Sequence, residues 1–185
     1  KWLGDPREYS CAQDPEILFH SYLYYSRKRP KLVSRDGCNR KKKEVFGKIK
    51  ERGKGWELLK IRIQNQIQFD DQVEVMDQYY EGEWKEKGGY HYLLYVNEEG
   101  EKVALKFHNQ ELTMTRFSTP KSIMKFIASE KGHALIPTPL GMQQFVIDTQ
   151  EYRLEQNRLG LSYQLLTADG SQQFATYRLE LTWED

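Results

Sequence analysis

The sequence predicts an all-β domain over residues 59–185, an antiparallel up-and-down barrel that is closed or nearly closed, behind a basic, partly helical extension over residues 1–58. Three observations predict this: side chains that alternate with a period of two, turn residues between short apolar segments, and a charge that changes sign at the boundary. Residues 1–58 hold 15 Lys+Arg and 8 Asp+Glu, a net of +7; subtraction from the totals of 28 and 27 leaves 13 and 19, a net of −6, for the barrel.

The extension is predicted to hold one helix or, alternatively, to be disordered. Asp14 and Pro15 are typical of a helix start, because Asp accepts free amide protons and Pro is tolerated at the first helical position. Apolar residues follow at helical spacing, and Pro30 ends the pattern. Residues 41–54 carry few apolar side chains, so a helix there would be marginal alone. Because no methionine precedes Met76, one interpretation of the extension is a gene start assigned too far upstream.

Alternation is strictest in the first and last segments of the domain, which predicts strands with one buried face. Their apolar members are Ile61, Ile63, Ile67 and Phe69 in the first segment and Ala175, Tyr177, Leu179, Leu181 and Trp183 in the last. Candidate strands between them cover residues 72–84, 89–96, 102–108, 111–117, 121–128, 133–137, 141–148, 150–157 and 160–167. Junctions such as Gly88-Gly89 suit tight hairpins, which predicts a meander. Closing that meander removes exposed sheet edges.

Four segments of the domain form a recognisable set: Gly82–Tyr95 (GEWKEKGGYHYLLY), Leu112–Arg116 (LTMTR), Met124–Phe126 (MKF) and Pro137–Thr149 (PTPLGMQQFVIDT). Together they resemble the YwiB-like family of uncharacterised bacterial proteins. The resemblance covers most of residues 60–185 and implies a calycin-like, or lipocalin-like, β-barrel of bacterial origin. It implies no activity, because the family has no settled one. Family members begin close to the position of Lys60, so the extension departs from the family pattern.

Four polar residues fall on the apolar face of their strands by the two-residue count: Asn65, Asp77, Arg116 and Asp148. A buried guanidinium without a partner costs several kcal/mol, so Arg116 needs a carboxylate, water or an anionic ligand. We expect Arg116 to pair with Asp77 or Asp148 and plug one end of the barrel. The alternatives are that Arg116 anchors a ligand, or that a bulge turns it outward.

Other side chains at strand spacing either line an interior cavity or fill it as core. They are Tyr79, Tyr92, Phe107, Met124, Phe126, Thr138 and Met142. The sequence therefore predicts a barrel that binds a small apolar or anionic molecule inside. The alternative is a packed barrel that acts as a protein-interaction or structural module without ligand, with a homodimer through an exposed strand or aromatic face.

No motif of catalysis, metal binding or cofactor binding is found. Gly-x-Ser-x-Gly, His-Glu-x-x-His and Cys-x-x-Cys are absent, and GKIKERGKG (residues 47–55) departs from the phosphate-binding loop pattern. Cys11, His20 and Cys38 fit no zinc template and lack a fourth ligand. We expect no enzyme, no metal and no cofactor.

The remaining expectations concern location and partners. The sequence contains no run of 18 apolar residues and no secretory signal pattern, so a cytoplasmic protein that does not enter the membrane is expected. Nucleic-acid binding rests on basic clusters at residues 27–31 and 40–43 with Tyr22, Tyr24 and Tyr25 nearby for stacking, and the alternative is a solvated tail. The acidic barrel argues against contact with a phosphate backbone.

Overall fold

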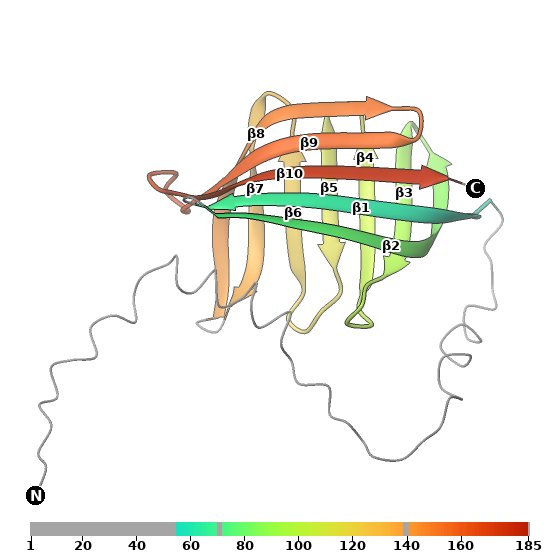
Figure 1. The fold of residues 1–185 in the computed structure, drawn as a ribbon, viewed down its shortest axis with the longest axis horizontal. Helices are drawn as coiled ribbons and strands as arrows, with labels where there is room; N and C mark the ends of the chain where they lie inside the picture. The colour runs from blue at the N-terminus through green and yellow to red at the C-terminus, as the bar shows by residue number, and fades with distance from the viewer. Residues whose placement is uncertain (1–54, 70–71, 139–140, 185) are drawn as a thin grey trace, which may run out of the picture. The chain divides into compact units, whose positions relative to one another are not determined.

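The computed structural model describes residues 55–69, 72–138 and 141–184, and these form a β-barrel of ten strands (Figure 1). The strands are β1 (Glu57–Phe69), β2 (Gln72–Lys87), β3 (Tyr90–Val96), β4 (Lys102–His108), β5 (Glu111–Arg116), β6 (Ser122–Ile127), β7 (Glu130–Thr138), β8 (Gly141–Glu155), β9 (Arg158–Leu166) and β10 (Gln173–Glu184). The first strand begins two residues before the expected boundary at residue 59. The predictions for residues 1–54 lie outside the described residues.

Each strand pairs with its neighbours in the sequence, and β10 closes the barrel on β1. The closing pair is antiparallel, with Ile61 opposite Trp183 and Ile67 opposite Tyr177. In Figure 1, β8, β9, β10, β1 and β2 form one layer that runs crosswise over the layer of β3 to β7. The predicted all-β, antiparallel and closed up-and-down barrel is confirmed.

The centre of the barrel is filled by side chains from both layers. Phe107 on β4 contacts Trp183 on β10 with ring centroids 5.5 Å apart, and Phe126 on β6 meets Tyr163 on β9 at 4.8 Å. Phe107 and Phe126 are 0% and 1% exposed. Since rings from opposite layers touch, the middle of the barrel has no room for a ligand between them.

Strand β8 corrects one prediction. Residues 141–148 and 150–157 were expected to form two strands, but Gly141–Glu155 is one strand whose pairing with β9 shifts between Thr149 and Glu151. No Gly, Pro or Asn separates the two segments, so no turn chemistry forces the chain to reverse. The extra residue is absorbed as a bulge, which keeps the strand continuous.

Strand β2 corrects the prediction that Asp77 and Tyr79 face the interior, because the odd-numbered side chains of this strand face solvent. Val73, Val75 and Tyr79 are 55%, 68% and 67% exposed. Pairing with β1 places Met76 opposite Asn65 and Gln78 opposite Ile63, so the even-numbered residues face the interior. The register imposed by β1 therefore prevails over the local hydrophobic pattern of β2.

Candidate functional site

Arg116 ends strand β5 and faces the inside of the barrel, opposite Val103 on β4 and Ser122 on β6. Its side chain is 35% exposed, which places the guanidinium at an opening rather than in the core. Nη1 lies 3.7 Å from Oε2 of Glu99, and Nε lies 3.7 Å from Oε2 of Glu101. The expected partners, Asp77 and Asp148, are replaced by these two glutamates.

The turn between β3 and β4 positions both glutamates. Asn97 Oδ1 accepts hydrogen bonds from the backbone N–H of Glu99 at 3.1 Å and of Glu101 at 2.8 Å. Asn97 Nδ2 also donates to Oε2 of Glu101 at 3.1 Å. The contacts from Arg116 to these carboxylates are longer than N–H···O hydrogen bonds, which measure about 2.7–3.2 Å. The two carboxylates thus balance the positive charge of the guanidinium, while its N–H groups remain available to donate hydrogen bonds.

Two tyrosines complete what we call the polar rim, namely Tyr80, Tyr95, Glu99, Glu101 and Arg116. The rings of Tyr80 on β2 and Tyr95 on β3 stack with centroids 4.8 Å apart. Burial, with a smaller contribution from nearby glutamates, raises the pKa of Tyr80 to about 12. Burial also raises the pKa of Tyr95. Both hydroxyls are therefore protonated at neutral pH and can donate hydrogen bonds.

Beside the rim, two methionines face each other across strands β5 and β6. Met114 pairs with Met124, both face inward, and both are partly exposed. The next inward residues on these strands, Leu112 on β5 and Phe126 on β6, are 0% and 1% exposed. The interior therefore changes from sealed core to accessible surface at the methionines. We call Gln78, Met114, Met124 and the polar rim the open end of the barrel.

Several side chains that the sequence placed inside lie outside the barrel. Asp77 accepts hydrogen bonds from Arg62 on β1, from Nε to Oδ1 at 2.9 Å and from Nη2 to Oδ2 at 2.7 Å. These bonds hold the pKa of Asp77 below its usual range. Tyr79 lies beside this pair, with the Arg62 guanidinium 5.4 Å from its ring centroid. Asp148 lies opposite Gln164 on β9. Because its neighbours Ile147 and Thr149 face inward, the side chain of Asp148 faces outward.

The other candidates divide between core, rim and surface. Phe126 is core, and Tyr92 faces outward opposite Lys106. Met124 lies at the open end. Thr138, the last residue of β7, donates from Oγ1 to the carbonyl oxygen of Gly141 at 3.0 Å. Asn65 faces inward as expected, and its Oδ1 is buried with no hydrogen-bond partner among the described residues. Of the nine predicted site residues, Asn65, Arg116, Met124 and Thr138 combine an inward strand position with partial exposure.

The structure also contains a groove that the sequence did not predict, on the outer face of β8, β9 and β10. Its volume is about 360 Å³. Gly160 forms the floor of the groove. It lies between Arg153 on β8 and Glu180 on β10, and beyond its chain neighbours no atom lies within 4 Å of the place where a Cβ of Gly160 would be. The rest of the lining is Glu151, Glu155, Arg158, Leu161, Arg178 and Leu179. The one sequence signal was the glycine between Leu159 and Leu161, at a strand's outward position.

Charges of both signs alternate around that groove. Arg153 Nη2 lies 2.7 Å from Oε1 of Glu151, and Arg158 Nη2 lies 2.7 Å from Oε2 of Glu180. Arg153 is 72% exposed and Arg158 is 53% exposed. Exposed ion pairs of this kind contribute little to stability. The groove is therefore a hydrated surface depression between solvated ion pairs.

The described parts of the chain show neither a membrane-spanning helix nor a cluster of metal-binding side chains. In residues 55–69, 72–138 and 141–184, no helix is both long enough and apolar enough to cross a bilayer. Within the same ranges, no three His, Cys, Asp or Glu side chains gather as a metal ion would require.

The fold and the site together define the class of protein: a closed antiparallel β-barrel with a packed centre and one accessible, partly polar end. The chain belongs to the family described as Domain of unknown function (DUF1934), whose model matches residues 61–181. A solved structure with the same fold is the crystal structure of ywiB protein from Bacillus subtilis, at a TM-score of 0.59 and 18% identity, covering 70% of this chain and 92% of that one. No curated protein matches. The YwiB-like resemblance is confirmed.

Proposed function

We infer that the barrel binds a small, mainly apolar molecule at its open end. The observation that carries this proposal is the accessible apolar surface of Met114 and Met124. Both side chains face inward and are partly exposed, whereas their inward neighbours Leu112 and Phe126 are sealed. Inward-facing apolar surface that solvent reaches, with a few polar groups at its edge, is characteristic of small-molecule sites. Methionine suits such a site because its flexible thioether adapts to ligands of different shape.

The electrostatics of the rim favour a neutral ligand over an anion. Arg116 already has the carboxylates of Glu99 and Glu101 at 3.7 Å each. An anion beside Arg116 would therefore also meet two negative charges, which offsets the attraction. The Tyr80 and Tyr95 hydroxyls are neutral donors, and they would orient a polar group on the ligand. Of the two ligand classes expected from the sequence, the apolar one has the better support.

The ligand is assigned to one end of the barrel rather than its centre, because the contact between Phe107 and Trp183 fills the middle. A calycin-like architecture, which the family resemblance implies, belongs to the same proposal. Its support is the meander of ten strands that closes on itself. In such barrels a ligand lies between the walls at an open end.

The experiment uses the full chain and the neutral fluorescent probe N-phenyl-1-naphthylamine. Its fluorescence should rise on mixing with the protein and saturate with protein concentration. Met124→Phe should weaken this binding about tenfold or more, because the larger ring occupies the accessible space. Met142→Phe is the matched control, since Met142 is 46% exposed on β8 and outside the open end.

Two outcomes would overturn the proposal. One is the absence of saturable fluorescence with the unaltered protein. The other is equal weakening by Met124→Phe and Met142→Phe, which would indicate that the probe adheres to general surface. Thermal unfolding of each variant establishes that a loss of binding is not a loss of fold.

A further inference from the structure

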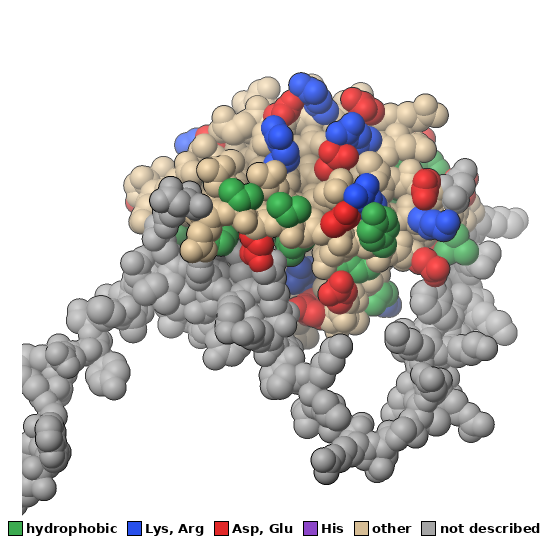
Figure 2. Space-filling view, viewed as in Figure 1, with side chains coloured by type: hydrophobic (Ala, Val, Ile, Leu, Met, Phe, Trp, Pro, Cys, Tyr) green, Lys and Arg blue, Asp and Glu red, His purple; other side chains and the backbone are tan. Residues whose placement is uncertain are grey.

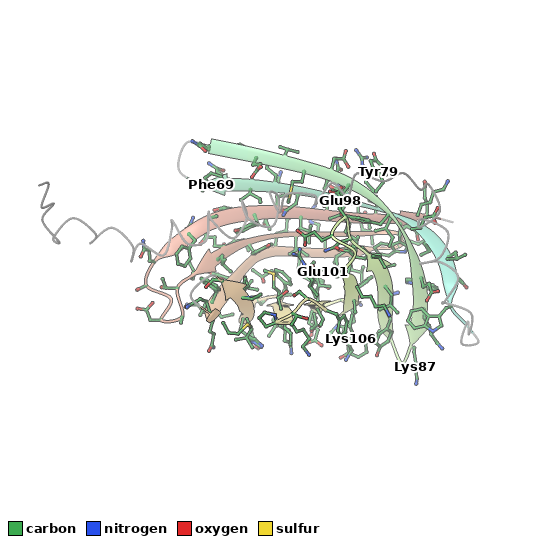
Figure 3. All side chains as sticks on the ribbon, turned by 90° about the horizontal axis from the view of Figure 1, so that it is seen from below. Phe69, Tyr79, Lys87, Glu98, Glu101 and Lys106 are labelled. Atoms are coloured by element: carbon green, nitrogen blue, oxygen red, sulfur yellow. The ribbon has the colours of Figure 1, made fainter. Side chains whose placement is uncertain are left out.

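The lysines and arginines of the barrel lie on different layers. Among the described residues, the crosswise layer of β8, β9, β10, β1 and the first part of β2 carries Lys60, Arg62, Arg153, Arg158 and Arg178. The other described lysines lie on or beside β3 to β7, or on the end of β2 that pairs with β3. They are Lys85, Lys87, Lys102, Lys106, Lys121, Lys125 and Lys131. We call this outer surface the lysine face. In Figure 3, Lys87 and Lys106 lie on the opposite side of the barrel from Tyr79.

The two layers also differ in how their cations are balanced. Arg62, Arg153 and Arg158 each have a carboxylate oxygen 2.7 Å away. Figure 2 shows positive and negative side chains side by side on this side of the molecule. On the lysine face, Lys125 contacts Glu111 at 3.0 Å. Other lysines of the face form no ion pair with any residue that the structure describes, namely Lys87, Lys102, Lys106 and Lys121. Their charges are therefore open to a partner.

Carboxylates are fewer than lysines on the lysine face. Those on it are Glu83, Glu111 and Glu130, of which Lys125 balances Glu111. Others lie at its margins, namely Glu86, Glu98 and Glu99, and Arg116 contacts Glu99 from the open end. Residues 59–185 as a whole carry a net charge of −6, but a partner responds to the charges that it meets locally. The net charge of the barrel is therefore a poor guide to this surface.

Tyr92 lies between two lysines on this face. It is opposite Lys85 on β2 and opposite Lys106 on β4, and its side chain faces outward because the adjacent Leu93 is buried. The Lys106 ammonium lies 4.2 Å from the centroid of the Tyr90 ring. Lys106 thus rests over an aromatic ring rather than against a carboxylate, so its positive charge is not balanced.

Phe117 repeats this arrangement at the end of β5. Its side chain is 54% exposed, and its N–H donates to the carbonyl oxygen of Lys102 on β4 at 2.8 Å. Arg116 pairs with Ser122, so the residues that continue these two strands, Phe117 and Lys121, lie side by side as well. Tyr92 and Phe117 therefore each have a lysine on either side.

We propose that the lysine face binds single-stranded nucleic acid, with bases stacked on Tyr92 and Phe117 and phosphates at the lysines beside them. Proteins that bind single strands combine aromatic rings, on which bases stack, with cations that follow the backbone. The Cα atoms of the two aromatic residues are about 16 Å apart, from two strand spacings and four residues along the strand. Between them lies one row of apolar or small side chains, namely Leu94, Ala104 and Thr115. A single strand can cross this row with its bases against the sheet.

A flexible single strand fits this surface better than a bilayer or a duplex does. The lysine face belongs to a closed barrel, so it curves across its strands. A flat anionic bilayer would touch only part of it and would meet Glu98 and Glu99 at the margin. A duplex keeps its base faces stacked inside, where Tyr92 and Phe117 do not reach them.

Fluorescence anisotropy of the full chain with labelled oligonucleotides tests the proposal. The probes are oligothymidylate and oligouridylate of about 12 nucleotides, a length that one small barrel domain can cover. Saturable binding to at least one of them is expected, and the comparison distinguishes DNA from RNA. A duplex of the same length should bind more weakly. The proposal is overturned by no saturable binding to either single strand, by tighter binding of the duplex, or by binding of phosphatidylglycerol vesicles in place of both strands.

Lys102→Gln tests the phosphate contacts. Because residues 1–58 are basic as well, variants are compared in the full chain, where the extension stays constant. Loss of one phosphate contact should weaken binding and reduce the slope of log Kd against log salt concentration by about 0.7. Lys60→Gln is the matched control, since Lys60 is an exposed lysine of the crosswise layer. Equal changes in the two variants would place the binding elsewhere and contradict the proposal.

Tyr92→Ala and Phe117→Ala test the stacking. Each should weaken binding at least about fivefold and leave the salt slope unchanged, because a stacked ring carries no charge. Tyr79→Ala is the control, since Tyr79 is 67% exposed on the other layer. Thermal unfolding of each variant separates a loss of binding from a loss of fold. Equal affinities of Tyr79→Ala and Phe117→Ala would show that no base stacks at the lysine face.

Discussion

The hydroxyl of Tyr152 on β8 lies 2.6 Å from the carbonyl oxygen of His108 and 2.9 Å from that of Glu111. His108 ends β4 and Glu111 begins β5, so one side chain joins β8 in one layer to a hairpin of the other. Tyr152 follows the bulge of β8, which re-aims the strand toward that hairpin. Burial raises the pKa of Tyr152, and the hydroxyl therefore keeps the proton that it donates.

Tyr152→Phe should lower the free energy of unfolding by about 0.5–1.5 kcal/mol, the usual net value of a hydrogen bond. The ring remains, so packing is preserved and only the link between the layers is lost. Urea unfolding at neutral pH measures the change. Tyr92→Phe is the control, since Tyr92 faces outward on β3, and it should leave the urea midpoint unchanged. Equal effects of the two variants would mean that the hydroxyl of Tyr152 adds nothing to stability.

Gly82→Ala should destabilise the barrel by about 1–3 kcal/mol through overpacking. A Cβ at Gly82 would overlap Cδ1 of Ile61 and lie 2.6 Å from the carbonyl oxygen of Leu94, so the backbone would have to shift. Gly160→Ala provides the comparison, because its Cβ would enter open space. That variant should change stability by no more than about 0.5 kcal/mol. Similar unfolding midpoints for both variants would contradict the close approach at Gly82.

Asp169 should titrate well below other aspartates. Its carboxylate accepts hydrogen bonds from the Thr167 hydroxyl and from the hydroxyl and backbone N–H of Ser171. These bonds, with that from Thr167 the largest contribution, lower the pKa of Asp169 to about 2. A lowered pKa means that the carboxylate stabilises the folded turn above pH 3.8, its ordinary value, and that this contribution is lost as pH falls toward about 2.

The carboxyl ¹³C chemical shift of Asp169, followed by NMR from neutral pH to pH of about 1.5, measures this titration. Thr167→Val removes the largest contribution and should move the midpoint upward toward 3.8. A midpoint that is the same in both proteins would show that the Thr167 hydroxyl does not hold the charge.

The sequence predicted the orientation of side chains best in the strands where the alternation of apolar residues agrees with the register of both neighbouring strands. The inward residues of β10, from Ala175 to Trp183, are all at most 7% exposed, as their two-residue spacing indicates. The inward residues of β1 from Leu59 to Ile67 are buried as well, apart from Asn65. In these strands the apolar face and the face chosen by the register coincide, so periodicity alone gives the correct orientation.

The candidate site was less predictable because it depends on relationships that local pattern does not contain. The apolar residues Val73 and Val75 gave β2 an inward face that its pairing with β1 reverses. Around Asp148, Phe145 and Ile147 are the inward residues, so the two-residue count that placed Asp148 on the apolar face selected the wrong side of the strand. The partners of Arg116 come from a turn held by Asn97, and a turn's carboxylates cannot be placed by strand alternation.

A last prediction concerns Asn65, the polar residue within the inward face of β1. Its Oδ1 is buried without a hydrogen-bond partner among the described residues, and Met76 and Leu179 lie opposite it on the neighbouring strands. An unsatisfied buried acceptor costs about 1–3 kcal/mol. Asn65→Val removes that acceptor and supplies a β-branched side chain, so it should raise the free energy of unfolding by about 1 kcal/mol.

Gln66→Val separates the two causes of this gain. Gln66 is the next residue of the same strand and is exposed, so valine there changes strand propensity without changing the interior. Asn65→Val should therefore stabilise the barrel more than Gln66→Val does in urea unfolding. If Asn65→Val instead lowers stability, Oδ1 accepts a hydrogen bond from a bound water. If it raises stability but weakens N-phenyl-1-naphthylamine binding, the polar residue is retained for the ligand at the cost of stability.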